Sequence, residues 1–279
     1  MPLEIPDSRN ESIAFIGGGN MASALIGGLL RRGLPASCIQ VIEPFAEQSA
    51  RLVQQFGVEV SEAPGAVLQR ATLVVWAVKP QTFRDAAAQC RAHAQGALHL
   101  SVAAGIRSGT LAGWLGTERI VRAMPNTPAL IGQGMTALYA RPGASEADRL
   151  AAERVVQPTG ELLWLEEETQ LDAVTALSGS GPAYVFYFIE AMVQAGIEMG
   201  LSSAQAHRLA VGTFVGASAL AKEAAEPPEV LRARVTSKGG TTHAALVSME
   251  ENGVKALFIE AMHAARERAR GMGDEFGSA

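Results

Sequence analysis

The feature that most constrains the fold is a glycine-rich turn, GGGNMA, which begins at Gly17 and joins an apolar run to a helical pattern. The apolar run is Ile13–Gly17, and the helical pattern covers Met21–Arg32. A turn of the form G-x-G-x-x-A keeps the backbone bare where the chain must turn tightly and where a pyrophosphate can approach. The small residue that ends it, Ala22, lets the helix pack closely on the strand. The turn and its setting predict a Rossmann-like unit that binds a dinucleotide.

Short apolar segments and helical patterns alternate through the first half of the chain. We expect strands at Ile13–Gly17, Ile39–Glu43, Val58–Val60, Thr72–Val78, Ala97–Val102, Arg119–Met124, Met135–Ala140 and Glu161–Leu165. Helical spacing occurs at Met21–Arg32, Glu47–Phe56, Thr110–Leu115 and Glu146–Val156. Strands that are apolar on both faces and alternate with helices are typical of a parallel sheet covered on both sides. The first half is therefore predicted to be an α/β domain.

The character of the chain changes after the acidic cluster that ends at Glu168. No strand pattern follows, and helical spacing covers Pro182–Gly200, Ala204–Ala225, Glu229–Val235 and Thr241–Arg270. We predict two domains, a Rossmann NAD(P)-binding domain over residues 1–168 and an all-helical substrate-binding and dimerisation domain over residues 169–279. A helical domain this apolar would expose a large patch as a monomer, which predicts a homo-oligomer. The tail Gly271–Ala279 is expected to fray.

Composition narrows the functional classes. The chain has 279 residues and a net charge of −5, so it lacks the basic character of a nucleic-acid binder. No apolar run reaches the roughly 18–20 residues of a membrane span, and the N-terminal MPLEIPDSRNES has no signal or transit pattern. Cys38 and Cys90 suggest neither a disulfide framework nor a zinc site. We expect a cytoplasmic protein with no metal, membrane or nucleic-acid partner.

The end of the second predicted strand tests the dinucleotide hypothesis. Glu43 stands there, somewhat further from the glycine turn than the usual spacing of about 20 residues. A carboxylate at this place accepts hydrogen bonds from ribose hydroxyls and repels a 2′-phosphate, which favours NAD over NADP. The alternative is that Glu43 turns away and caps the next helix. The residues predict NAD(P)H as the cofactor, with NADH at least usable.

Two further strand ends lie where a dinucleotide is expected. Lys79 closes the strand Thr72–Val78 and precedes Pro80, and its ammonium group can reach a ribose or a phosphate. The alternative is a solvated lysine. After Arg119–Met124 the chain reads PNTP, in which two prolines fix the loop while Asn126 and its neighbour present hydrogen-bonding groups toward the nicotinamide.

Two runs of small residues precede helices in the second half. SGSGP begins at Ser178, and TSKGGTT begins at Thr236. Bare amides and hydroxyls at a helix N-terminus suit an anion, although plain helix caps are the alternative. Two such loops, each with paired glycines, favour contact with a ligand. The substrate this pattern favours is small and carries a carboxylate that backbone amides bind.

No general-base constellation is visible among the histidines. His93 and His99 lie away from predicted loop ends, His207 and His263 fall within helical patterns, and His243 follows Thr242. Core or surface positions account for each of them. This absence fits the reduction of a protonated imine, which needs a hydride, orientation and a proton from water or a hydroxyl.

Five segments in this order carry a family resemblance: GGGNMA, AVKP, MPNTP, SGSGPAY and VTSKGGTT. Along essentially its whole length the chain resembles the pyrroline-5-carboxylate reductase family. The resemblance implies NAD(P)H-dependent reduction of 1-pyrroline-5-carboxylate to L-proline, the last step of proline biosynthesis. It also implies dimers intertwined through the helical half, commonly assembled further into decamers.

The resemblance also implies roles for individual residues. The pyrophosphate would be held by Gly17, Gly19, Asn20, Met21 and Ala22. Lys79 and Pro80 would lie beside the cofactor, and Asn126 near the nicotinamide. The substrate carboxylate would be held by Ser237, Gly239, Gly240, Thr241 and Thr242. Thr242 is the candidate catalytic residue, because its hydroxyl would approach the ring nitrogen, and Thr175 and Ser178 would border the pocket.

One departure from the family pattern and two alternative functions remain. Lys238 stands where the family usually has proline, which loosens the loop and adds a positive charge, and we expect modest consequences for activity. A β-hydroxyacid dehydrogenase would need a lysine shortly after Gly181, but the next lysine is Lys222. A dinucleotide-sensing protein without turnover would not need a second anion site.

Overall fold

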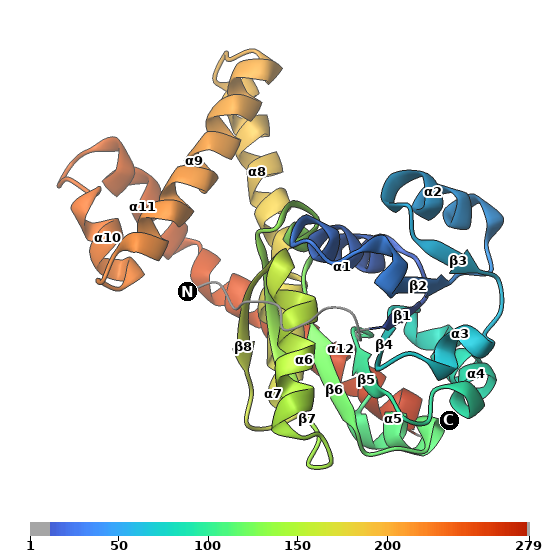
Figure 1. Ribbon diagram of the computed structural model, residues 1–279. Helices are drawn as coiled ribbons and strands as arrows, with labels where there is room; N and C mark the ends of the chain where they lie inside the picture. The colour runs from blue at the N-terminus through green and yellow to red at the C-terminus, as the bar shows by residue number, and fades with distance from the viewer. Residues whose placement is uncertain (1–11, 278–279) are drawn as a thin grey trace. The chain divides into compact units, whose positions relative to one another are not determined.

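The computed structural model describes residues 12–277 (Figure 1). The N-terminal segment on which the expectation of no targeting peptide rests lies almost entirely outside them. The chain forms two compact units. The sheet unit comprises the chain up to Gly179 together with the segment from Ala265 onward, and the helical unit is Ser180–Ala264. No helix of the described residues is both long and apolar enough to cross a membrane.

The sheet unit is built on one sheet of eight strands in the order β3-β2-β1-β4-β5-β6-β7-β8. The strands are β1 Ile13–Ile16, β2 Ile39–Ile42, β3 Glu59–Ser61, β4 Leu73–Trp76, β5 Leu98–Ser101, β6 Ile120–Met124, β7 Gly134–Ala140 and β8 Gly160–Trp164. All pairs are parallel except β6 with β7. The expectation of a wholly parallel sheet is therefore wrong at this pair. The segment 125–133 between these strands is too short for a crossover, which takes a dozen or more residues.

Alternate residues of the strands serve two cores, one on each face of the sheet. Phe15 and Val75 face a core that Leu25 of α1 and Leu52 of α2 complete. Trp76 faces the opposite core, with side chains of α4 and α5. The helices of this unit are α1 Asn20–Arg31, α2 Ala46–Phe56, α3 Ala66–Gln69, α4 Pro80–Cys90, α5 Ser108–Leu115, α6 Glu146–Val156 and α7 Gln170–Val174. Short 3-10 helices lie at η2 Ala36–Cys38, η3 Arg91–His93, η4 Thr127–Ile131 and η5 Gln157–Thr159. Helix α4 was not predicted from the sequence.

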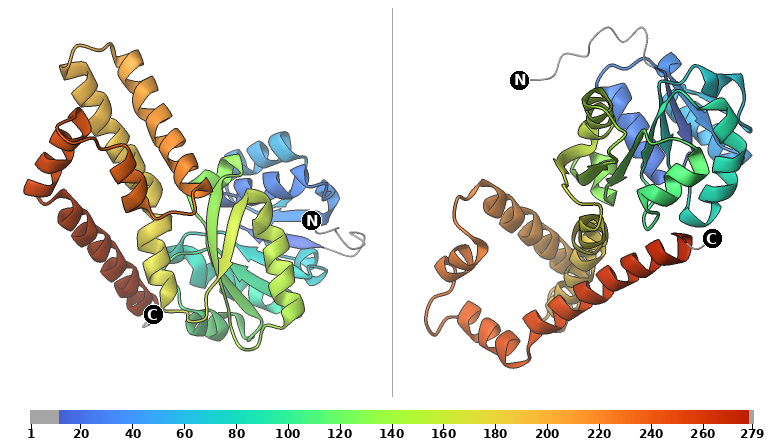
Figure 2. Two further views of the ribbon diagram at one scale, coloured as in Figure 1. Left: turned by 90° about the vertical axis from the view of Figure 1, so that its left-hand side faces the viewer. Right: turned by 90° about the horizontal axis from the view of Figure 1, so that it is seen from below.

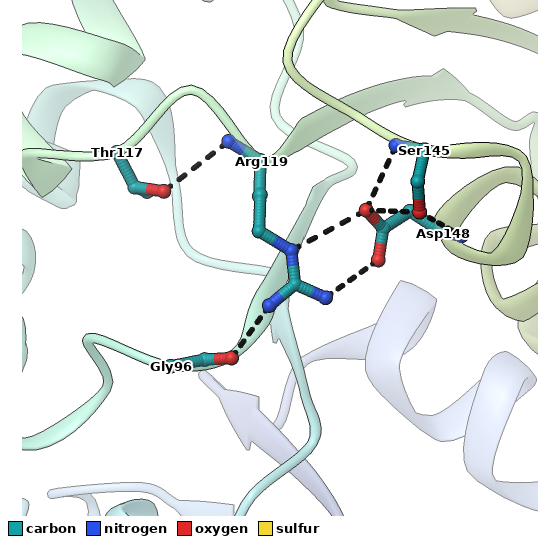
Figure 3. Close-up of polar contacts among 5 residues, drawn as sticks. All are labelled: Gly96, Thr117, Arg119, Ser145 and Asp148. Carbon is teal, nitrogen blue, oxygen red and sulfur yellow. Dashed lines mark hydrogen bonds and ion pairs between the residues drawn. The ribbon is translucent and has the colours of Figure 1, made fainter.

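Helix α6 is fastened to the chain just before β6 by a charged network (Figure 3). The Arg119 guanidinium donates to both carboxylate oxygens of Asp148, at 2.7 and 3.3 Å, and to the Gly96 carbonyl oxygen at 2.7 Å. The same carboxylate and Ser145 form a capping box at the start of α6. Burial favours the neutral form of Asp148, but hydrogen bonds from Arg119 and Ser145 outweigh it and lower the pKa of the carboxyl.

A second buried ion pair follows the last strand. Arg122 of β6 lies 2.7 Å from the Glu168 carboxylate, and the side chains of the two are 8% and 23% exposed. The Ser108 hydroxyl at the start of α5 donates to the other Glu168 oxygen at 2.7 Å. Burial favours the neutral form of Glu168, but these donors outweigh it and lower its pKa. Glu168 therefore holds the segment after β8 against α5 and β6.

The histidine on β5 is a buried structural residue, as the sequence suggested. His99 is 2% exposed, its Nδ1 accepts a hydrogen bond from Trp76 Nε1 at 2.9 Å, and its Nε2 lies 3.2 Å from the Ala94 carbonyl oxygen. Burial lowers the pKa of His99 to about 4. The neutral imidazole thus satisfies both of its polar neighbours at neutral pH.

The helical unit contains α8 Gly181–Glu198, α9 Ser203–Glu223, α10 Pro228–Arg234 and α11 Thr241–Glu251, together with the first part of α12 Val254–Gly277. Helices α8 and α9 run side by side (Figure 2), and a side chain at Gly196 would lie 2.9 Å from the Ala206 Cβ. The single helix expected over Thr241–Arg270 is wrong. The chain breaks it at Gly253, which has a φ of +65° that favours glycine.

The end of α12 belongs to the sheet unit, so the expectation of a frayed tail from Gly271 is wrong up to Gly277. Phe276 packs against the core on the α4 and α5 face. Asp274 pairs with Arg107 at 2.7 Å. The boundary predicted after Glu168 also falls inside the sheet unit, because the ion pair with Arg122 ties that segment to the sheet.

Candidate active site

The glycine-rich turn between β1 and α1 is shaped by close packing on one side. Gly17 has a φ of +90°, and a Cβ there would lie 2.8 Å from the Ala77 carbonyl oxygen, just after β4. A Cβ at Gly18 would overlap the Leu52 side chain of α2. Gly17 is required because its backbone is left-handed and abuts a backbone carbonyl, whereas a side chain at Gly18 would have to displace the buried Leu52 side chain. Gly18 is the position of the fingerprint that sequence reasoning left without a role.

The other side of the turn is open. A Cβ at Gly19 would meet nothing within 4 Å, and Gly19 begins α1 without a side-chain cap. The amides of the first turn, which includes Asn20 and Met21, therefore have no side-chain partner and suit an anion. Ala22 is fully buried in the core against the sheet. This geometry fits the pyrophosphate of a dinucleotide.

Glu43 follows β2 and is 6% exposed. Its Oε2 accepts a hydrogen bond from the Gly18 amide at 2.8 Å, and its Oε1 accepts one from the Phe45 amide at 3.0 Å. Gln48 Nε2 donates to the Gly18 carbonyl oxygen at 2.5 Å. The carboxylate therefore bonds to the glycine turn and to the amide of Phe45, the N-cap residue of α2.

Lys79 and Pro80 lie at the start of α4 rather than in a plain loop. Lys79 is the N-cap of that helix and is exposed, and Pro80 occupies the first helical position, where its missing N–H costs no hydrogen bond. The Lys79 carbonyl oxygen accepts a hydrogen bond from the Thr82 amide at 3.0 Å. The backbone of Lys79 therefore belongs to the helix start, while its side chain is exposed. Lys79 lies two residues after Ala77, whose carbonyl oxygen is next to Gly17.

Asn126 links two segments that sequence reasoning assigned to different tasks. Its Oδ1 accepts a hydrogen bond from the Met135 amide at 2.8 Å, and its Nδ2 donates to the Ser178 carbonyl oxygen at 3.1 Å. The loop after β6 is thereby tied to the segment that precedes α8. Both ends of the Asn126 amide are engaged within the protein, which makes it a positioning group for this edge of the site.

Thr175 and Ser178 lie in a π-helical turn, η6 Thr175–Gly179. Thr175 Oγ1 donates to the Leu171 carbonyl oxygen at 2.7 Å, and Ser178 Oγ donates to the Val174 carbonyl oxygen at 3.2 Å. A Cβ at Gly179 would come within 2.5 Å of Met124 Cε, so this glycine permits close packing on the end of β6. Such turns are frequent at functional sites.

The residues from Ser237 to Thr242 lie in the helical unit, at the start of α11. Gly239 has a φ of +77°, and the Gly240 amide donates to the Ser237 carbonyl oxygen at 3.0 Å. Gly240 begins α11 without a side-chain cap, and Thr241 and Thr242 are exposed in its first turn. The loop therefore presents amides and hydroxyls in the form that suits a carboxylate. All the other predicted site residues belong to the sheet unit.

Comparison with known proteins assigns the family. The family model described as pyrroline-5-carboxylate reductase dimerisation matches residues 168–272, and the model described as NADP oxidoreductase, coenzyme F420-dependent, matches residues 12–105. The pyrroline-5-carboxylate reductase of Pseudomonas aeruginosa is 44% identical over 270 residues, which cover 95% of this chain and 98% of that protein. This chain belongs to the pyrroline-5-carboxylate reductase family. The Escherichia coli relative of the same name is 37% identical and covers 93% of this chain and 97% of its own length.

Solved structures agree. The pyrroline-5-carboxylate reductase from Coxiella burnetii is 34% identical, with a TM-score of 0.87, over 94% of this chain and 98% of the other. The Plasmodium falciparum pyrroline carboxylate reductase, solved with NADP bound, is 28% identical, with a TM-score of 0.86, over 95% and 98%.

These findings confirm the predicted family, the two-part fold with a Rossmann-like first half, and the use of NAD(P)H by an oxidoreductase. They also confirm the predicted reduction of pyrroline-5-carboxylate to proline. A β-hydroxyacid dehydrogenase and a dinucleotide sensor without turnover are not favoured. The helical half carries the family's dimerisation region.

Proposed function

We propose that this chain reduces 1-pyrroline-5-carboxylate to L-proline, the last step of proline biosynthesis, with the residue roles set out below. The C=N bond of the cyclic imine takes up one hydride at carbon and one proton at nitrogen. The observation that carries this proposal is the match of nearly the whole chain to curated reductases of this name. The open, uncapped glycine turn supports it independently.

NAD(P)H, when bound, supplies the hydride. Amides at Gly19, Asn20 and Met21 hold its pyrophosphate at the start of α1, and Gly17 and Ala22 shape the turn. Glu43 faces the adenosine ribose. The Lys79 side chain and Pro80 lie beside the cofactor, and Asn126 holds the loop near the nicotinamide in place through Met135 and Ser178.

The substrate carboxylate is held at the start of α11. Amides of Gly239 and Thr241 and the hydroxyl of Ser237 bind it, so no arginine is needed, and Gly240, whose amide donates to the Ser237 carbonyl oxygen, shapes the loop around it. The Thr242 hydroxyl approaches the ring nitrogen and orients it or passes a proton to it. Thr175 and Ser178 border the pocket. Lys238 adds a positive charge to the loop that binds the carboxylate.

In function the chain divides as predicted, with dinucleotide binding over residues 1–168 and substrate binding and dimerisation over residues 169–279, although the segment up to Gly179 and the end of α12 pack with the sheet unit. The chain acts as a homodimer, with decamers as the higher assembly, in the cytoplasm. Large apolar side chains left exposed in the helical unit support a self-association surface; examples are Phe186, Tyr187 and Leu220.

One experiment tests the reaction and its cofactor together. The purified chain is mixed with NADH or NADPH and with 1-pyrroline-5-carboxylate, dinucleotide absorbance is followed, and proline is identified by mass spectrometry. We expect dinucleotide oxidation only when the imine is present, with proline formed in equal amount. Oxidation without proline, or no substrate-dependent oxidation with either dinucleotide, would contradict the proposed function.

A further inference from the structure

The Glu43 carboxylate is fixed by the backbone on both of its oxygens. One oxygen accepts the Gly18 amide at 2.8 Å and the other accepts the Phe45 amide at 3.0 Å. The residue is 6% exposed, so rotating the side chain away would leave the buried Gly18 N–H and the partly buried Phe45 N–H without this acceptor. The negative charge therefore stays at the end of β2 whether or not a dinucleotide is bound.

The turn that receives this carboxylate is held from the other side as well. Gln48 of α2 donates to the Gly18 carbonyl oxygen at 2.5 Å. Gly18 is thus hydrogen-bonded at its amide by Glu43 and at its carbonyl oxygen by Gln48. A Cβ at this residue would overlap Leu52. Glu43 and the glycine turn consequently form one rigid piece, in which the carboxylate cannot yield to a bulky anion.

No positive charge in this segment compensates that carboxylate. The chain from Glu43 to Ala50 contains no lysine or arginine, and the first turn of α2 adds a second acid, Glu47. Arg51 already pairs with Glu47 at 2.6 Å. In a Rossmann fold the end of β2 meets the adenosine ribose, where NADH has a hydroxyl and NADPH has a phosphate.

We infer that Glu43, locked against the glycine turn, is the residue that makes this chain select NADH over NADPH. The inference rests on the proposed function, since it concerns the cofactor of that reaction. The free lone pairs of the carboxylate accept a ribose hydroxyl, whereas a 2′-phosphate would meet a fixed like charge. The selection thus acts on binding and does not require the chemical step.

The test measures binding rather than turnover. Fluorescence titration of the purified chain with NADH and with NADPH gives two dissociation constants, and competition with 5′-AMP and with adenosine 2′,5′-bisphosphate repeats the comparison on the adenosine end alone. The wild-type chain is expected to bind NADH at least about tenfold more tightly than NADPH, and the two nucleotides in the same order. Glu43→Gln keeps an acceptor but removes the charge, and is expected to bring the two dinucleotides within about threefold of each other.

Glu47→Gln is the matched control, because it removes an acid of the same helix start that is exposed and touches no residue of the turn. Its selectivity is expected to equal that of the wild type. Equal or tighter binding of NADPH by the wild type, or unchanged selectivity in Glu43→Gln, would overturn the inference and leave the reductase function standing. If the wild-type chain bound neither dinucleotide, both the inference and the proposed reductase function would be contradicted. The competition between the two adenosine nucleotides uses the wild-type chain alone. It therefore tests the selectivity for NADH even if the Glu43→Gln variant misfolds.

Discussion

The two units of the chain differ in how far they bury their large apolar side chains. In the sheet unit most strand residues are buried, and Phe15, Trp76 and Phe83 are fully buried between the sheet and its own helices. In the helical unit Phe186 and Tyr187 are 64% and 70% exposed. The sheet unit completes its core by itself, whereas the helical unit presents more apolar surface than its own packing uses. We therefore expect the sheet unit to be stabilised mainly by its own core and the helical unit to be stabilised by assembly.

The largest effect is expected from breaking the buried ion pair of the sheet unit. Arg122→Met removes the guanidinium 2.7 Å from Glu168 and leaves a half-buried carboxylate with only its Ser108 donors. We expect the free energy of unfolding to fall by about 3–5 kcal/mol, measured by urea denaturation at fixed chain concentration. The control Arg51→Met breaks an exposed pair and should change it by less than about 1 kcal/mol. Equal losses in both variants would contradict the local-core account.

Acid should weaken the sheet unit through His99. Its pKa is lowered to about 4 in the fold, so the unfolded chain binds a proton near pH 6.5 while the folded chain does not. The stabilisation is complete above pH 6.5 and is lost as the pH falls toward 4, at about 1.4 kcal/mol per pH unit and roughly 3 kcal/mol in all. His99→Gln offers an acceptor to Trp76 and a donor to Ala94 without titrating. Urea denaturation across this range should show a shallower slope for the variant, and identical slopes would refute the assignment.

The helical unit should respond in its assembly instead. Tyr187→Glu places a charge on an exposed aromatic position of α8, and we expect the dissociation constant of the dimer to rise at least about 30-fold, the scale of a single interface hot spot. Sedimentation velocity over a concentration series measures it. Phe45→Glu alters a ring that is 73% exposed in the sheet unit and should leave association unchanged. An unchanged dimer in Tyr187→Glu would remove this face from the interface.

The smallest effect is expected at the start of α11. Thr242→Ala removes the proposed contact with the ring nitrogen and should lower kcat/KM for the imine at least about tenfold, while dinucleotide affinity stays within about twofold. Steady-state kinetics and a dinucleotide titration separate the two. Thr213→Ala, which removes a hydroxyl that bonds to its own helix at Leu209, is the control and should change neither. An equal loss of dinucleotide affinity in Thr242→Ala would place the residue on the cofactor side.

Much of the fold could be predicted because the strands of a covered sheet are short apolar runs, and each of the eight lies within a residue or two of its expected place. Helix α4 was missed because its sequence, from Pro80 to Cys90, is much more polar overall than that of α1, although it still buries Phe83, Ala87 and Cys90. The reversed direction of β7 was missed because apolar spacing predicts a strand but carries no sign of its direction. The helix breaks at Gly253 because the backbone there is left-handed. The apolar spacing continues on both sides of this residue, so the sequence pattern predicts one helix.

The sequence predicts the parts of the site that depend on backbone conformation. It does not predict the parts that depend on where a side chain points. The open Gly19 and the tight Gly17 follow from the fingerprint. That Glu43 bonds to Gly18, and that Asn126 spans Met135 and Ser178, depends on tertiary approach between segments far apart in the chain. No local pattern contains that information. A glycine at the middle position of the turn was the available signal for the first of these contacts.

The last turns of α12 add side chains to the core of a unit that is otherwise built from residues up to Gly179. Phe276 packs beneath α4 and α5, and Asp274 pairs with Arg107. On the ribosome, the sheet unit therefore lacks part of its interior until α12 has left the exit tunnel. Removing the last turns of α12 is consequently expected to weaken the sheet unit, although most of that unit comes from the other half of the sequence.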